Sequence, residues 1–111
     1  MGIGQLSPLE SALIAAFHEL YGSQGFPAPE RIQVKRRENT GVGRYTEIEA
    51  EDHVDLDDGC VDLGGRFIEM TGVPNGLMAI AHVRDHRLEQ LEIVVYGEDQ
   101  WDGVERDWSI A

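Results

Sequence analysis

The sequence predicts an α+β protein in which one N-terminal helix packs on a single antiparallel sheet of about five or six strands. Two observations lead to this class. The one stretch with clear helical periodicity comes first, and the rest of the chain alternates between strand-like runs and short turns. Short links favour antiparallel pairing, with the helix across one sheet face. We expect one domain over 1–111, with the helix at 7–21, strands within 31–96 and an acidic aromatic tail at 97–111.

The helix is predicted from its start signal and its apolar stripe. Ser7, Pro8 and Glu10 match an N-cap residue, a first-turn proline and the third-position glutamate of a capping box. Gly22 is expected just beyond the last helical residue, where glycine commonly ends a helix. Five residues recur at helical spacing and form the expected buried stripe: Leu9, Leu13, Ala16, Phe17 and Leu20.

The segments 31–37 and 44–51 flank a Gly-Val-Gly step, and one hairpin register gives both of them a consistent pattern. Antiparallel pairing about Gly41, with a tight turn at 40–43, places Val34 opposite Ile48 on an apolar face. On the other face the register pairs side chains of opposite charge or of complementary type: Lys35 with Glu47, Gln33 with Glu49, and Arg37 with Tyr45.

Arg36 is the basic residue that this register leaves over. It falls on the apolar face beside Thr46, where an arginine either pairs with a buried acid or lines a binding site. We favour the pairing with an acid. The glycine step does not predict a phosphate-binding loop, because it lacks the P-loop and dinucleotide spacings and leads into a strand instead of a helix.

A second hairpin is predicted from the apolar runs 77–83 and 88–96, which flank a tight turn at Asp85 and His86; residues 72–76 form a separate turn before it. The expected register places Ile80 opposite Leu91, Met78 opposite Ile93, and His82 opposite Glu89. Ala79 and Ala81 then face away from the helix. We expect the strand to be interior to the sheet, and its second face to be covered by the tail or by a second subunit.

The composition excludes several classes of partner. The formal net charge is −12, which disfavours nucleic acid and anionic membrane surfaces and favours a basic protein as partner. Cys60 is the only cysteine, so an internal disulfide is impossible. No apolar run reaches the length of a membrane span, and no signal peptide is recognisable. We therefore expect a cytoplasmic protein, either a monomer or a homodimer.

No pattern in the sequence predicts a catalytic or metal centre. The acidic stretch 49–62 lacks the EF-hand spacing, and His82 and His86 lack the zincin context. Acidic neighbours of Cys60 would disfavour its thiolate. We accordingly assign no catalytic residue, no metal ligand and no cofactor, and we lean against an enzyme.

Six residues are the candidates for binding: Arg36, Tyr45, Asn75, Tyr96, Trp101 and Trp108. The two tryptophans lie in the charged tail, where an aromatic side chain either folds back onto the sheet or forms a surface for a partner. We favour the core role for Trp101 and leave both roles open for Trp108.

Three stretches resemble a family of small bacterial proteins of uncharacterised function. They are "RENTGVGRYTEI" (37–48), "GVPNGLMAIAHV" (72–83) and "LEQLEIVVYGEDQW" (88–101), an intermittent match spread over about the last two thirds of the chain. The shared motifs are Thr-Gly-Val-Gly-aromatic-Thr, Gly-x-Pro-x-Gly-Leu and Leu-Glu-x-x-x-Tyr-Gly-x-x-x-Trp. This sequence departs from the first motif by carrying Arg44 before Tyr45. The resemblance implies a compact α+β domain and no particular activity.

Two functions compete at this level. The first is an interaction protein whose acidic surface binds a basic partner, as an immunity protein binds a cationic toxin. The second is a small-ligand-binding protein or an enzyme, with a pocket between helix and sheet lined by Arg36, Tyr45 and Tyr96. A deep pocket with converging polar groups would favour the second, and a flat acidic face the first.

Overall fold

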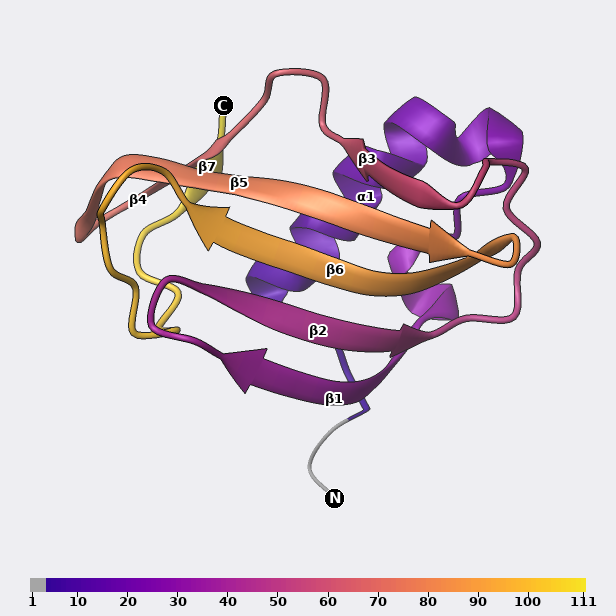
Figure 1. The fold of residues 1–111 in the computed structure, drawn as a ribbon, viewed down its shortest axis with the longest axis horizontal. Coiled ribbons are helices and arrows are strands. Elements are labelled where there is room, and N and C mark those ends of the chain that lie inside the picture. Colours follow the sequence, from indigo (N-terminus) through magenta and orange to yellow (C-terminus); the bar gives the residue numbers. More distant parts are fainter. Residues whose placement is uncertain (1–3) are drawn as a thin grey trace.

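The structure is a computed structural model that describes residues 4–111. One helix lies behind an antiparallel sheet, and the carboxy-terminal tail wraps round one end of it (Figure 1). The elements are the helix α1 (Pro8–Tyr21), the short 3₁₀ turns Gly22–Gln24 and Pro29–Arg31, and the strands β1 (Gln33–Asn39), β2 (Gly43–Glu49), β3 (Gly59–Asp62), β4 (Ile68–Met70), β5 (Val73–Arg84), β6 (Arg87–Val95) and β7 (Ser109–Ile110).

The predicted α+β class is confirmed, and the sheet has the order β1-β2-β6-β5-β4-β7, with β3 also paired to β5. Strand β5 is therefore interior, as expected: β6 lies along one side of it and β3 and β4 along the other. Two details differ from the prediction. The tail contributes the short strand β7, and the expected turn 72–76 is mostly strand, because β5 already begins at Val73.

The predicted start of α1 is confirmed, but its end and part of its stripe differ. The Ser7 hydroxyl accepts from the Glu10 backbone N–H, and the Glu10 carboxylate accepts from the Ser7 N–H, which completes the capping box. Gly22 keeps a right-handed helical conformation; the left-handed residue is Gly25, at φ 92°. Leu20 is 47% exposed, and the next residue, Tyr21, packs against the core instead.

In the first hairpin the predicted pairs Val34–Ile48 and Gln33–Glu49 are confirmed, and the predicted register beyond Val34 is wrong by one residue. Val34 lies opposite Ile48, but a β-bulge follows, so that Arg36 instead of Lys35 lies opposite Glu47. Beyond the bulge Arg37 faces Thr46 on the helix side, and Glu38 instead of Arg37 faces Tyr45. The predicted inward position of Arg36 is thus taken by Arg37. The tight turn is present, with the Thr40 N–H donating to the Gly43 carbonyl at 3.0 Å.

The second hairpin has the predicted turn, and Leu91 and Ile93 of β6 face the helix as predicted, but the residues of β5 face opposite to the prediction. Asp85 and His86 both have positive φ (52° and 59°), as a two-residue turn of the favoured twist requires. A register shift between His82 and Val83 then pairs Ala79 with Ile93, Ala81 with Leu91 and Ile80 with Glu92. The alanines therefore face the helix, and the predicted pairs Ile80–Leu91 and Met78–Ile93 do not form.

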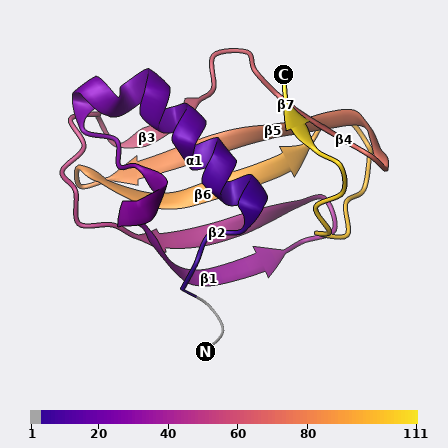
Figure 2. The same cartoon turned by 180° about the vertical axis from the view of Figure 1, so that it is seen from behind.

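The core lies between α1 and the sheet and includes part of the tail. Leu9, Leu13 and Phe17 of the helix pack against inward residues of β2, β5 and β6, and Trp101 joins them with 2% of its surface exposed. Figure 2 shows α1 crossing this face of the sheet obliquely. The tail packs on the same side, so the predicted cover of the other face by the tail is wrong. Within residues 4–111 the helix is too short to cross a membrane.

Candidate functional site

The face of the sheet opposite α1, here called the open face, has no helix or loop packed across it in the part of the chain that the structure describes (Figure 1). Its centre is a row of outward side chains, one from each of five adjacent strands, in which carboxylates alternate with apolar residues. Successive partners in this first row are Glu38, Tyr45, Glu92, Ile80 and Asp62. Tyr45 is 39% exposed, and Ile80 is partly exposed. Met78 and Val94 extend the apolar part beside the row.

A second row runs parallel to the first and is mainly polar. Its successive partners are Arg36, Glu47, Gln90, His82 and Cys60. Arg36 forms ion pairs with Glu38 and Glu47 at 3.5 and 3.6 Å, both of them exposed to solvent. His82 lies opposite Gln90 instead of the predicted Glu89, and its Nε2 lies 2.9 Å from the carboxylate of Glu92. On the open face Arg36 therefore lies at the β1 side, Arg84 and Arg87 lie at the β5–β6 turn, and the carboxylates of the two rows lie across the middle.

On the helix side a buried ionic cluster holds helix, sheet and tail together. The Glu10 carboxylate is fully buried and accepts from Arg37 at 2.8 and 2.5 Å, and from the Thr46 hydroxyl at 2.8 Å. Arg44 is 5% exposed and lies between Glu10, at 3.3 Å, and Glu105 of the tail, at 2.7 Å. An inward arginine paired with a buried acid was predicted for Arg36; the structure contains this arrangement at Arg37 and Arg44 instead.

The cluster also anchors the tail at a defined place. The guanidinium of Arg44 lies over the ring of Trp101, 4.8 Å from its centroid, and donates to the Gly103 carbonyl at 2.6 Å. The Trp101 indole N–H donates to the Val104 carbonyl, and Glu105 accepts from the Leu9 N–H at the start of α1. Every buried side-chain nitrogen and oxygen in residues 4–111 has a partner, which is how a sealed structural cluster differs from a reactive site.

The charge state of the cluster follows from these contacts. Burial alone would raise the pKa of the Glu10 carboxyl, but the hydrogen bonds from Arg37, the Ser7 N–H and Thr46 outweigh burial and hold that pKa below its ordinary value. The same bond to Glu10 raises the pKa of Arg37. Glu10 is therefore a carboxylate at neutral pH, paired with the charged guanidinium of Arg37.

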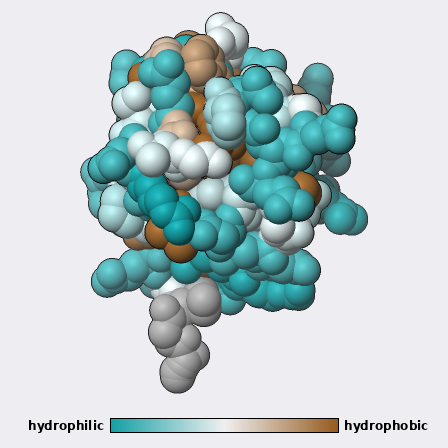
Figure 3. All heavy atoms as spheres, turned by 90° about the vertical axis from the view of Figure 1, so that its left-hand side faces the viewer, coloured by the Kyte–Doolittle hydropathy of each residue, from teal (hydrophilic) through white to brown (hydrophobic). Residues whose placement is uncertain are grey.

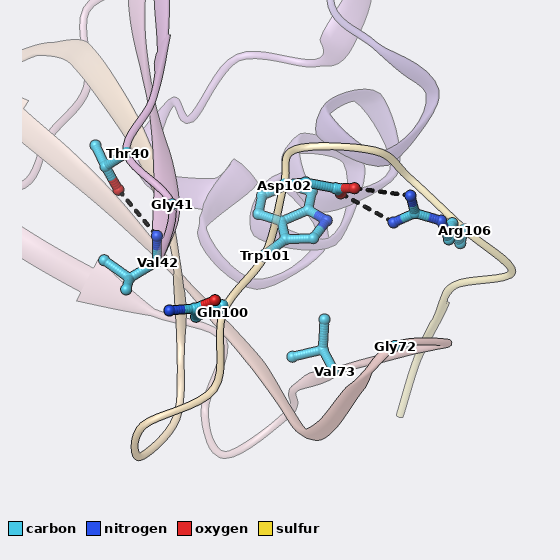
Figure 4. A pocket seen from close by; sticks show the side chains of 9 residues that line it. All are labelled: Thr40, Gly41, Val42, Gly72, Val73, Gln100, Trp101, Asp102 and Arg106. Atoms are coloured by element: carbon cyan, nitrogen blue, oxygen red, sulfur yellow. Dashed lines mark hydrogen bonds and ion pairs between the residues drawn. The ribbon is translucent and has the colours of Figure 1, made fainter.

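One concavity lies at the end of the molecule that carries the Thr40–Gly43 turn and the start of β5, here called the turn end, and not between helix and sheet. Figure 3 views this end, where mostly hydrophilic residues surround a few hydrophobic ones. The hollow has a volume of about 540 Å³ and is open to solvent. Figure 4 shows its lining: Thr40, Gly41, Val42, Gly72, Val73, Gln100, Trp101, Asp102 and Arg106. Arg106 donates to Asp102 at 2.9 and 2.7 Å, and this lowers the pKa of Asp102 to about 2.

The six predicted binding residues do not form one site. Arg36 and Tyr45 share a small outer hollow of about 200 Å³ on the open face, so they point away from the helix. Asn75 and Tyr96 lie near each other at the turn end, where the Tyr96 N–H donates to the Gly76 carbonyl and Asn75 donates to Asp99. Trp101 is buried as favoured, and Trp108 is partly buried against the core. The predicted pocket between helix and sheet is filled by core side chains.

Sequence reasoning placed Glu92 on the outward face correctly, but it missed the outward position of Ile80 and the buried roles of Glu10, Arg44 and Glu105. Ile80 was placed on the wrong face because the register shift, in which Glu89 of β6 is the extra residue, cannot be recognised from a β5 run that is apolar at every position from Leu77 to Ala81. Glu10 did carry a signal, the capping box, but that signal gives no sign of its second role as the partner of two arginines. Among residues 4–111 no group of three or more acidic, histidine or cysteine side chains is arranged to hold a metal ion.

Comparisons of the chain with models of known protein families, with curated proteins and with solved structures found no match to any of them. The resemblance to small bacterial proteins stated above accordingly stays a prediction.

Proposed function

We propose that this chain is a protein-interaction module that binds a basic protein through the open face of its sheet. The observation that carries the proposal is the first row, in which Tyr45, exposed, and Ile80, partly exposed, lie between the carboxylates of Glu38, Glu92 and Asp62. Apolar side chains bordered by carboxylates suit a basic partner, and two of these carboxylates, Glu38 and Glu92, also pair with Arg36 and His82 on the same face. An immunity protein that neutralises a cationic toxin is one example of such a module.

The net charge supports a different protein as the partner over a second copy of this chain. Two copies that each carry a formal charge of −12 repel each other, and their acidic rows would face each other in a dimer built on the open face. The same charge attracts a basic protein and accelerates its association at low ionic strength. We therefore propose a monomer that acts in the cytoplasm on a cationic protein, with neither nucleic acid nor a membrane surface as its target and with no reaction of its own.

Affinity capture from a lysate of the native host tests the proposal when it compares two matched variants. Ile80→Lys adds a cation to the open face, and Leu20→Lys makes the same change at an exposed site on α1. We expect the unaltered chain and Leu20→Lys to retain one basic protein in stoichiometric amount at low salt and to release it at high salt, and Ile80→Lys to lose it. Equal retention by both variants, or no basic protein at low salt, would reject the proposal.

A second candidate, a small-ligand-binding protein, rests on the hollow at the turn end. There the buried ring of Trp101 meets the Asp102–Arg106 ion pair, which is the combination of one aromatic and a few polar groups common in ligand sites. Thermal unfolding with a metabolite set distinguishes it. A ligand that raises the midpoint of the unaltered chain but not that of Val42→Lys, at the rim of the hollow, would support this function.

A further inference from the structure

We infer that the partner of the open face presents a basic amphipathic helix, laid across the strands, whose lysines or arginines recur every seven residues. This inference rests on the proposed function and adds the shape of the partner. It starts from the order of the first row, which is acid, Tyr45, acid, Ile80, acid across β1, β2, β6, β5 and β3.

The spacing of the row sets the spacing of the partner. Neighbouring strands lie about 4.8 Å apart, so Glu38 and Glu92, like Glu92 and Asp62, are about 9.6 Å apart across the sheet. Seven residues of an α-helix rise about 10.5 Å along the helix axis. Apolar residues three or four positions after each basic residue lie about 5 Å further along that axis. An extended strand repeats its side chains on one face about every 6.7 Å, which matches neither interval.

The residues on either side of the first row limit where the partner's helix can lie on the open face. Arg36 lies in the second row, paired with Glu38 at 3.5 Å and with Glu47 at 3.6 Å, and would repel a basic helix that shifted towards it. On the other side of the first row lie Met78 and Val94, which are apolar and partly exposed. A basic helix is therefore held over the first row, with its apolar stripe against Ile80, Tyr45 and these two residues.

The sheet already accepts a helix that does not follow its strands, because α1 crosses the opposite face obliquely (Figure 2). A second copy of this chain has no suitable helix to offer in its described residues. Helix α1, with the sequence PLESALIAAFHELY, carries two glutamates and neither lysine nor arginine, and its apolar stripe is already buried.

Two labelled synthetic peptides of the same composition test the inference. In the first, lysines recur every seven residues with leucines three and four residues after each; in the second, the same residues are reordered so that lysines recur every five. Both carry alanine elsewhere to favour the helix. Fluorescence anisotropy at low salt should show the first peptide binding at least about 10-fold more tightly, because only its charges coincide with the row.

Glu92→Gln, at the centre of the row, should weaken the first peptide about 5-fold, whereas Glu19→Gln, which removes the same charge from the exposed side of α1, should leave its affinity unchanged. Circular dichroism confirms that both variants keep the fold. Equal affinity of the two peptides, or equal effects of the two substitutions, would overturn the helical spacing. If Ile80→Lys nevertheless abolishes capture of a basic protein, the proposed function stands with a partner of another shape; if it does not, both fail.

Discussion

Glu10→Gln should destabilise this protein far more than an ordinary surface substitution, although glutamine has almost the same shape. The carboxylate of Glu10 is fully buried and accepts from Arg37, Arg44, Thr46 and the Ser7 N–H. Breaking a buried ion pair by removing one partner costs about 3–5 kcal/mol. We expect a loss near the lower limit, about 3 kcal/mol, because Arg44 keeps Glu105 and the side chain of Arg37 is 21% exposed. That is a large part of the roughly 5–15 kcal/mol that stabilises a domain.

Urea unfolding, followed by circular dichroism and tryptophan fluorescence, measures this loss. The matched control is Glu19→Gln, which makes the same change at an exposed position of α1 and should alter the free energy of unfolding by less than about 0.5 kcal/mol. The double variant of Glu10→Gln with Arg37→Gln should lose less than the sum of the two single losses, because the two residues share one interaction.

The pH dependence supplies a second and independent measurement. The pKa of Glu10 is lower in the folded protein than its ordinary value of 4.5, so the folded state favours the ionised form. Its contribution is fully present above pH 4.5 and is lost as the pH falls through the lowered pKa. The difference in stability between the unaltered chain and Glu10→Gln should therefore be constant from pH 7 to about pH 5 and shrink below it. A difference under about 1 kcal/mol at pH 7, or one that grows on acidification, would refute the reasoning.

Three further outcomes follow from the structure. Gly43→Ala should cost about 2 kcal/mol or more in urea unfolding, because the added Cβ would lie 2.2 Å from the Ile93 carbonyl oxygen of a neighbouring strand; a smaller loss would mean that the two strands separate easily. In an NMR titration the Asp102 carboxyl should show a pKa of about 2, and Arg106→Gln should return it towards 3.8; an unchanged pKa would contradict the ion pair. Amide exchange should be slow for residues 80–83 of β5, which lie between β3 and β6, and fast for the two-residue strand β7; fast exchange in β5 would indicate a sheet edge.

The elements of this fold were accessible to sequence reasoning because each has a local signal. The capping box at Ser7 and Glu10 marks the start of the helix, and the turn at Asp85 and His86 marks the second hairpin. The Val34–Ile48 pair was accessible as well, since a slip by one residue would expose Val34. These signals lie within a few residues of the features that they specify.

The sequence could not show which face of the sheet each residue occupies beyond the bulge in β1 and beyond the register shift between β5 and β6. Alternation gives the phase of a strand only where one phase is polar, and every residue of β5 from Leu77 to Ala81 is apolar. In β1 four charged residues follow one another from Lys35 to Glu38, so alternation cannot show that Lys35 is the extra residue of a bulge. The partner of an inward arginine was equally hidden, since Glu10 precedes Arg37 by 27 residues and Arg44 by 34.

The two irregularities also decide what the open face displays. Without the bulge at Lys35, Arg37 would stand beside Tyr45 and the first row would begin with a cation; with it, Glu38 takes that place and Arg37 reaches Glu10 in the interior. Without the shift between His82 and Val83, Ala79 and Ala81 would face outward; with it, Ile80 does so and lies opposite Glu92. The row of alternating acidic and apolar side chains, and the buried pair that fixes the helix, therefore depend on the same local departures from regular pairing.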